Sequence, residues 1–246
     1  MPSWADRGRF GRLDALRAVA ILWMAAFHFC FDLNYFGLIH QAFTRDAFWT
    51  VQRDCIVSLF LFCAGLGQAV AHAQGQGWPR FWRRWLQLAG CAVLVSVASW
   101  FMFPQSFISF GVLHGIAVML IIARLCAGVK LWLWPLGFIA LVLPHVVQHP
   151  VFDSRWLNGV GLVTHKPFTE DYVPVLPWLG VVLWGMAAGQ WLLAHRPHGL
   201  SGPLPRALSP LALLGRWSLT FYMVHQPVLI GLLYAWVHLV SVPSAP

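Results

Sequence analysis

Charged side chains are scarce in this sequence of 246 residues: they make up 10%, whereas 59% of the residues are hydrophobic. Soluble domains carry about a quarter charged residues, so this composition excludes an ordinary soluble fold. A membrane-spanning helix needs about 20 apolar residues, and the hydrophobic content suffices for about seven such helices. Little sequence is left over for a separate soluble domain. We therefore predict a single all-α membrane domain over residues 1–246.

Cysteine is scarce too, and the five cysteines all fall within apolar stretches. Thiols in such places usually act as small hydrophobic groups. Because their spacing matches neither a disulfide framework nor a zinc site, we predict no metal. The first apolar stretch is long, contains His28 and Asp32, and lacks a small-residue cleavage site. It is therefore expected to stay as a membrane helix rather than to be removed as a signal peptide.

The sequence predicts a polytopic helix bundle, because its apolar runs are long enough to cross a bilayer. Two prolines, Pro135 and Pro144, interrupt the fifth run and make it the weakest. The seven runs are Leu13–Phe36, Ala47–Ala71, Phe81–Phe103, Ser109–Cys126, Leu131–Val147, Val175–Ala194 and Leu214–Val240. Small residues such as Gly65, Gly185 and Gly189 favour close helix packing within the bundle.

The formal net charge of +8 reflects basic residues that are spread in small groups between the apolar runs. This distribution is not that of a nucleic-acid-binding protein, and we expect no nucleic-acid partner. If the N-terminus is cytoplasmic, most Lys and Arg residues fall in inner segments. The outer side then holds only Arg45, Arg53, Arg155 and Lys166. The bias predicts a cytoplasmic N-terminus and an outer C-terminus.

Four ionisable residues lie on one face of the first predicted helix, where an unpaired charge costs several kcal/mol. The step from Arg17 to His28 is about three turns, so both side chains project from one face, roughly 16 Å apart. Asp14 and Asp32 join this face, one turn before Arg17 and one turn after His28. The result is a polar stripe that runs across the membrane.

This stripe suits an anion at the inner end and proton transfer nearer the outer end. Arginine grips phosphate with two hydrogen bonds, and neutral histidine takes a proton near pH 7. Asp32 is placed to orient or charge-balance the imidazole of His28. The alternative is structural: Asp14 and Arg17 merely pair at the membrane interface, and His28 bonds to a neighbouring helix.

Other predicted spans contribute polar residues that are either site residues or hydrogen-bonding groups between helices. His114 lies at a depth similar to that of His28. Ser218, Tyr222, His225 and Gln226 lie along one side of the last helix.

Basic residues also enter the third helix from the cytoplasmic side. Arg80 and Arg83 either follow the ordinary positive-inside pattern or complete an anion site with Arg17. His40, in the first outer loop, is a secondary candidate for the site, and Arg53 is expected to pair with Asp32.

The longest segment outside the predicted spans is the outer loop 149–174. It is either a substrate loop or a plain connector. Its carboxylates, Asp153, Glu170 and Asp171, are expected to be solvated.

Ordered motifs along nearly the whole chain resemble those of one family. The motifs are Leu13–Met24, His28–Gly37, Phe110–Gly115, Pro174–Gly180 and Leu214–Pro227. They look like the bacterial proteins grouped with the catalytic domain of heparan-alpha-glucosaminide N-acetyltransferase. The wider transmembrane acyltransferase superfamily, including acyltransferase type 3 proteins, shares a basic residue followed by ten residues and a histidine. Arg17 and His28 are similar to this pair, and Arg80 and Arg83 are similar to its Arg-x-x-Arg motif.

The resemblance implies transfer of an acyl group, commonly acetyl, from cytoplasmic acetyl-CoA to a saccharide outside the bacterial inner membrane. Arg17, Arg80 and Arg83 would bind the nucleotide phosphates, and His28 would be the general base on an amine or hydroxyl acceptor. In the animal heparan enzyme, the position similar to His28 is Asn and the essential histidine follows in a region similar to that of His40. Both histidines therefore remain candidates for the base.

The rival interpretation is a proton-coupled small-molecule transporter, in which intramembrane His and Asp relay protons. The absence of an inverted repeat, which many transporters show, argues against it. A third interpretation is a structural subunit whose polar residues only join helices. The sequence leaves the acceptor, the acyl chain length and direct transfer versus an acyl-enzyme open, and it is compatible with a homodimer.

Overall fold

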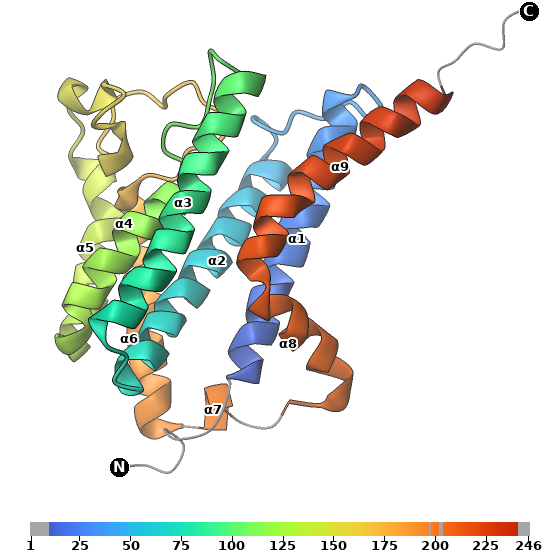
Figure 1. The fold of residues 1–246 in the computed structure, drawn as a ribbon. Coiled ribbons are helices and arrows are strands. Elements are labelled where there is room, and N and C mark those ends of the chain that lie inside the picture. Colours follow the sequence, from blue (N-terminus) through green and yellow to red (C-terminus); the bar gives the residue numbers. More distant parts are fainter. Residues whose placement is uncertain (1–9, 197, 202–203, 241–246) are drawn as a thin grey trace, which may run out of the picture. The chain divides into compact units, whose positions relative to one another are not determined.

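The computed structural model describes residues 10–196, 198–201 and 204–240. The described chain is helical and contains no β-strand, only an isolated bridge between Phe110 and Tyr172. The fold class is therefore all-α, as the sequence predicts. Figure 1 shows the α-helices, which are α1 (Gly11–Tyr35), α2 (Ala47–Ala73), α3 (Trp78–Met102), α4 (Val112–Leu125), α5 (Leu133–Val146), α6 (Val175–His195), α7 (His198–Ser201), α8 (Ser209–Arg216) and α9 (Ser218–Val240). Short 3-10 turns lie between them, among them η2 (Cys126–Gly128), η3 (Lys130–Trp132), η4 (Pro150–Asp153) and η5 (Asn158–Val160).

Within the described residues, α1, α2, α3, α6 and α9 are long and apolar enough to cross a membrane. The chain is thus a multi-pass membrane protein. The other two predicted runs also form helices, α4 and α5, but each is only 14 residues long. The prolines do not interrupt α5. Pro135 lies in its first turn, where backbone N–H groups have no partner within the helix, and Pro144 lies near its end.

The last predicted run differs from the structure at its start. The sequence predicts one helix from Leu214, whereas the chain forms α8 and then, after a break at Trp217, α9. Trp217 has φ −98° and ψ 19°, which lies outside the helical region. The break turns the chain between two helices that share the core described below.

The described chain forms two compact units, and each is described by itself. The larger unit comprises Met1–Leu13 and Leu61–Pro203. In it, α6 packs closely on the second half of α2. A Cβ atom at Gly65 would overlap the Val182 carbonyl, and one at Gly185 would overlap the Phe62 carbonyl. The prediction of close packing at these two glycines is therefore confirmed.

The smaller unit comprises Asp14–Phe60 and Leu204–Pro246. Its core is apolar and joins α1, the first half of α2, α8 and α9. The core residues are Ile21, Met24 and Ile56, packed against Phe27, Phe60, Leu214, Phe221 and Tyr222. Burial of these side chains stabilises the unit by about 1.5–3 kcal/mol for each fully buried residue. It also sets α1 beside α9, the two helices that carry the polar residues considered next.

Candidate functional site

Four polar side chains meet in the smaller unit, two from α1 and two from α9. His28 contacts His225, with ring centroids 5.2 Å apart. The Nε2 group of Gln226 donates a hydrogen bond of 2.8 Å to Oδ1 of Asp32. We call these four residues the histidine cluster. His28 and Asp32 lie one turn apart on α1, and they face His225 and Gln226, which are consecutive on α9. Two local patterns therefore form one site.

Several polar atoms of the histidine cluster are buried but have no hydrogen-bond partner among the described residues. They are Asp32 Oδ2, His225 Nε2 and Gln226 Oε1. Asp32 is 3% exposed and His225 is 9% exposed, so bulk water does not readily satisfy these atoms. Most buried polar groups in folded proteins are hydrogen-bonded, and a group of exceptions in one place points to a ligand or to ordered water. The cluster therefore has the character of a binding site rather than of a helix-joining network.

The hydrogen bonding of His225 determines which ring nitrogen is free. Its Nδ1 lies 2.6 Å from the carbonyl oxygen of Tyr222. A carbonyl oxygen only accepts hydrogen bonds, so Nδ1 carries the proton and Nε2 of the neutral ring keeps its lone pair. Phe221 stacks on His225 with an interplanar angle of 5°, and Phe27 packs edge-on against His28. Both rings are thus held in place by aromatic neighbours.

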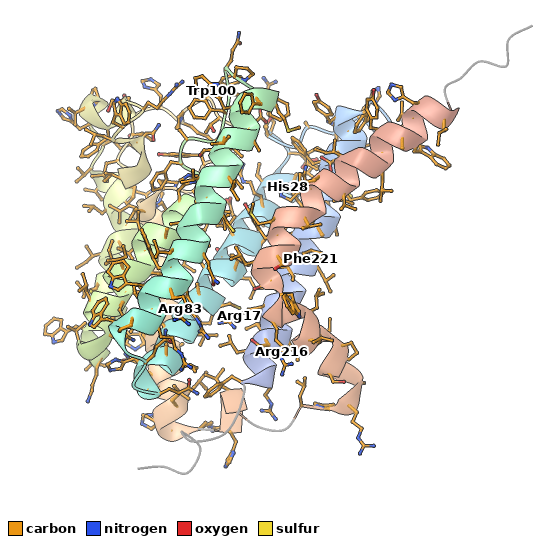
Figure 2. The ribbon with its side chains drawn as sticks, in the orientation of Figure 1. Arg17, His28, Arg83, Trp100, Arg216 and Phe221 are labelled. Atoms are coloured by element: carbon orange, nitrogen blue, oxygen red, sulfur yellow. The ribbon has the colours of Figure 1, made fainter. Side chains whose placement is uncertain are left out.

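A second polar feature lies nearer the start of α1, on the same helix as His28. Arg17 donates to Asp14 Oδ1 at 2.9 Å. The Asp14 carbonyl lies so close to Gly215 that a Cβ there would overlap it, which brings the end of α8 against the first turns of α1. Arg216 follows and is exposed. Figure 2 shows Arg17 and Arg216 at the end of this unit that carries α8, away from His28. In the sequence, Arg216 is one of the basic residues on the predicted inner side, and no local pattern assigns it to the site.

Two predictions concern polar residues of the smaller unit outside the histidine cluster, Arg53 and His40. Arg53 was expected to pair with Asp32, and this prediction is wrong: its Nη2 bonds to Asp54 at 3.2 Å, and Asp32 bonds to Gln226 instead. His40 lies exposed between α1 and α2, and no described residue forms a hydrogen bond to its side chain. The structure places His40 outside the histidine cluster.

The other predicted site residues belong to the larger unit. Arg80 and Arg83 lie in the first two turns of α3 and are exposed, and Figure 2 shows Arg83 near that end of the helix. His114 is engaged at both ring nitrogens. Its Nδ1 accepts from the Gly111 backbone N–H at 3.3 Å, and its Nε2 lies 3.1 Å from Ser96 Oγ. These bonds tie α3 to the start of α4, so the geometry favours a structural role for His114.

Carboxylates of the outer loop also have partners, contrary to the expectation of plain solvation. Oδ2 of Asp171 accepts from the Val112 backbone N–H at 2.7 Å, at the start of α4. Glu170 accepts from the hydroxyl of Ser106. No local pattern signals these pairings, because the partners are about 60 residues apart in the chain.

Metal binding is not indicated by the described part of the chain, in which no group of three or more His, Cys, Asp or Glu side chains is placed to hold an ion. The chemistry available in the histidine cluster is that of imidazole, carboxylate and amide groups. Such groups transfer protons and hydrogen-bond to polar substrates.

Comparison with protein families gives a match over most of the chain. The family model described as "Heparan-alpha-glucosaminide N-acetyltransferase, catalytic" matches residues 9–227. Neither the comparison with curated proteins nor that with solved structures found a match. The matched residues include α1, which carries Arg17 and His28, and the first part of α9, which carries His225 and Gln226. The chain therefore belongs to the family of the heparan-alpha-glucosaminide N-acetyltransferase catalytic domain and is a membrane acetyltransferase.

Proposed function

We propose that this protein transfers an acetyl group from cytoplasmic acetyl-CoA to an amine or hydroxyl group of a saccharide outside the membrane. The observation that carries the proposal is the histidine cluster, with its buried polar atoms that lack partners, in a chain of an acetyltransferase family. A transferase needs a base for the acceptor and donors for the thioester oxygen. The cluster supplies an imidazole pair and an amide at one place.

His28 is the proposed general base, because its ring contacts His225 and, unlike that ring, forms no hydrogen bond to another described residue. The base takes the proton from the acceptor amine or hydroxyl as the acceptor attacks the thioester carbonyl carbon. The carbon–sulfur bond then breaks, and the coenzyme A thiolate leaves and takes up a proton. His225 and Asp32 hold the base and its developing charge in place. His40 and His114 are the weaker candidates for this role, because His40 is exposed and both ring nitrogens of His114 are engaged in hydrogen bonds.

The donor end of the proposed site is the pair Arg17 and Arg216. Arg17 bonds to Asp14 through Nη1, which leaves further N–H groups of the guanidinium for a phosphate. Asp14 positions Arg17 for this contact. Arg80 and Arg83 stay candidates for phosphate binding on the sequence alone, through their similarity to the Arg-x-x-Arg motif of the wider superfamily. A distance of roughly 16 Å along α1 between Arg17 and His28 suits a long donor whose phosphates and reactive carbon lie far apart.

The membrane placement belongs to the same proposal. We propose seven spans, with the N-terminus in the cytoplasm of a bacterium and the outer loop 149–174 beyond its inner membrane, as one functional domain in the bilayer. The distribution of basic residues supports this orientation. With their adjoining 3-10 turns, α4 and α5 extend over Val112–Gly128 and Lys130–Val146. At about 1.5 Å per residue, each is close to the shortest length that spans a bilayer. A homodimer is compatible with this arrangement.

Acetyl-CoA binding by the purified full chain tests the donor half of the proposal. Saturating acetyl-CoA should raise the thermal midpoint, because a ligand that binds only the folded state stabilises it. Arg17→Gln should weaken the binding of acetyl-CoA at least tenfold. Arg45→Gln is the matched control: Arg45 is an exposed arginine of the same unit, and its replacement should change nothing. If acetyl-CoA produces no shift at any concentration, the donor assignment fails.

A further inference from the structure

A cavity of about 250 Å³ lies in the larger unit, formed by the segment after α3 and by the loop between α5 and α6. It shares no residue with the histidine cluster. The side chains that matter for its chemistry are Gln105, Phe107, Asp153, Arg155, Asn158 and Phe168. Ligand pockets for drug-sized molecules have volumes of about 300–1,000 Å³, so this cavity suits a ligand of one ring.

Hydrogen bonds between distant parts of the chain fix the walls of this cavity. The hydroxyl of Thr169 donates to the Phe107 carbonyl at 2.9 Å, and the Glu170 N–H donates to the Ser106 carbonyl at 2.9 Å. Tyr172 Oη donates to the Asn158 carbonyl at 2.7 Å, which joins the two parts of the loop. The cavity is therefore built into the fold rather than a gap in an unattached loop.

Asn158 is the polar group that this arrangement leaves unsatisfied. It is 4% exposed, and its Oδ1 is buried with no hydrogen-bond partner among the described residues. Its backbone groups are both engaged, since the N–H donates to Ser154 and the carbonyl accepts from Tyr172. A buried amide oxygen without a partner costs free energy, and a donor group on a ligand would recover it.

Phe168 gives the same cavity an apolar face. Its side chain is 81% exposed, so the cavity opens to the surface on this side. Phe107 is already covered, because the Arg155 guanidinium lies 4.9 Å from its ring centroid. Phe168 therefore has a ring face available to a ligand, and Arg155 is held where the edges of its guanidinium remain free to donate hydrogen bonds.

We propose that this cavity binds one sugar unit of the acceptor, with the ring of Phe168 against its C–H face and Asn158 bonded to a hydroxyl group. A sugar ring combines an apolar face with a rim of hydroxyl groups that donate and accept, and the cavity offers a partner for each. A phosphate group is disfavoured because the lining carries a negative group, Asp153, as well as the positive Arg155, and an acyl chain is disfavoured by the polar Asn158. That the sugar is the acceptor rests on the proposed function, whereas sugar binding does not.

A nearby residue provides a control. Trp156 is 95% exposed in the same loop but does not line the cavity. An exposed aromatic residue of this kind suits the membrane interface, as does Phe168 if it has no ligand. Replacing each in turn separates an aromatic residue that binds sugar from one that only anchors the loop.

Saturation-transfer NMR on the full chain in nanodiscs, without acetyl-CoA, tests the proposal. The probes are glucose, galactose, glucosamine and N-acetylglucosamine. At least one should receive saturation from the protein, with Phe168→Ala weakening its binding about tenfold or more and Trp156→Ala leaving it unchanged. Asn158→Ser is a second variant that keeps a small polar group. No binding by any of the four sugars, or equal losses for Phe168→Ala and Trp156→Ala, overturns the proposal.

A transfer assay then separates this inference from the proposed function. Phe168→Ala should raise the KM for the sugar and leave the kcat and the KM for acetyl-CoA unchanged. The same assay can compare a free sugar with that sugar on a membrane-anchored alkyl chain. If Phe168→Ala raises the KM of both equally, only the sugar lies in the cavity. A larger effect on the free sugar would indicate that the anchored sugar is held mainly by the bilayer. If sugar binding depends on Phe168 but no transfer occurs, the proposed function fails and the sugar site stands.

Discussion

Two polar sites, the start of α4 in the larger unit and the histidine cluster in the smaller unit, differ in how the fold satisfies their side chains. In the larger unit, His114 has both ring nitrogens engaged, and Asp171 bonds to the backbone at the start of α4. In the smaller unit, Asp32, His225 and Gln226 each keep a buried polar atom without a partner. Composition does not explain the difference, because each set contains a histidine and an aspartate. The difference lies in whether the fold completes the hydrogen bonds.

A hydrogen-bond network in which every polar atom has a partner holds helices together. A network with unsatisfied atoms can bind a ligand. Each unsatisfied buried group costs about 1–3 kcal/mol, so three such atoms in one cluster are a considerable cost to the stability of the smaller unit. Such a cost is common where a site must bind a ligand and change protonation. The comparison therefore separates two histidines, His28 and His114, that look alike in the sequence.

The largest expected effect concerns the imidazoles. His28→Ala and His225→Ala should each lower the kcat of acetyl transfer by about 10²–10⁴-fold, which is the contribution of a positioned general base. Thermal stability should change little, because neither ring completes a hydrogen bond between helices. His114→Ala is the comparison variant: it should lower the thermal midpoint and keep the kcat within tenfold. The opposite pattern, with His114 essential for transfer and His28 dispensable, would contradict the distinction between these two sites.

Replacement of Asp32 should have a smaller effect on the kcat. It also tests, through the free energy of unfolding, whether the histidine cluster serves function rather than stability. Asp32→Asn keeps an oxygen for the bond from Gln226 Nε2 but removes a buried charge. We expect the kcat to fall about tenfold to a hundredfold, because the imidazole loses its charge-balancing partner. The free energy of unfolding should stay the same or rise, because a buried charge without full hydrogen bonding costs stability. A marked loss of stability with full activity would assign Asp32 to the framework.

Much of this fold follows from local sequence patterns. Apart from the start of the last run, the predicted apolar runs coincide with the observed helices, because a bilayer demands uninterrupted apolar stretches and helices satisfy their own backbone. The pairing of Asp14 with Arg17 follows from the same helical periodicity. Pro135 misled the prediction of α5 only because its position in the first turn was not recognised.

The contacts that define the histidine cluster do not follow from any local pattern. Asp32 and Gln226 are 194 residues apart in the chain, so their hydrogen bond depends on the packing of α1 against α9. The break at Trp217 that sets the start of α9 likewise has no sequence signal comparable to a proline. Local patterns therefore identified His28, Asp32 and His225 as candidates, but they paired Asp32 with His28 or Arg53 rather than with Gln226.

In the completed network, Asp171 should matter for stability alone. Asp171→Ala leaves the Val112 N–H without its acceptor at the start of α4, a loss comparable to removal of a helix cap. We expect the free energy of unfolding to fall by about 1–2 kcal/mol, measured by denaturation in detergent. Asp54→Ala is a suitable control, because its salt bridge with Arg53 is exposed. Acetyl-CoA binding should be the same in Asp171→Ala, in Asp54→Ala and in the unaltered protein. A loss of binding in Asp171→Ala would contradict a purely structural role.

The smallest expected effect is a pH dependence in the outer loop, where Asp153 also belongs to a completed network. Hydrogen bonds from the Thr164 hydroxyl, and then from backbone N–H groups, hold the pKa of Asp153 below its ordinary value of 3.8. The folded loop therefore binds a proton less readily than the unfolded chain does. The contribution of these bonds is complete above pH 3.8 and is lost as the pH falls through the lower folded value. Backbone hydrogen exchange at Thr164 and His165, corrected for intrinsic rates, should show this loss only below the ordinary pKa. Asp153→Asn should remove the pH dependence, and a transition at or above pH 3.8 in the unaltered protein would show that these hydrogen bonds do not form in solution.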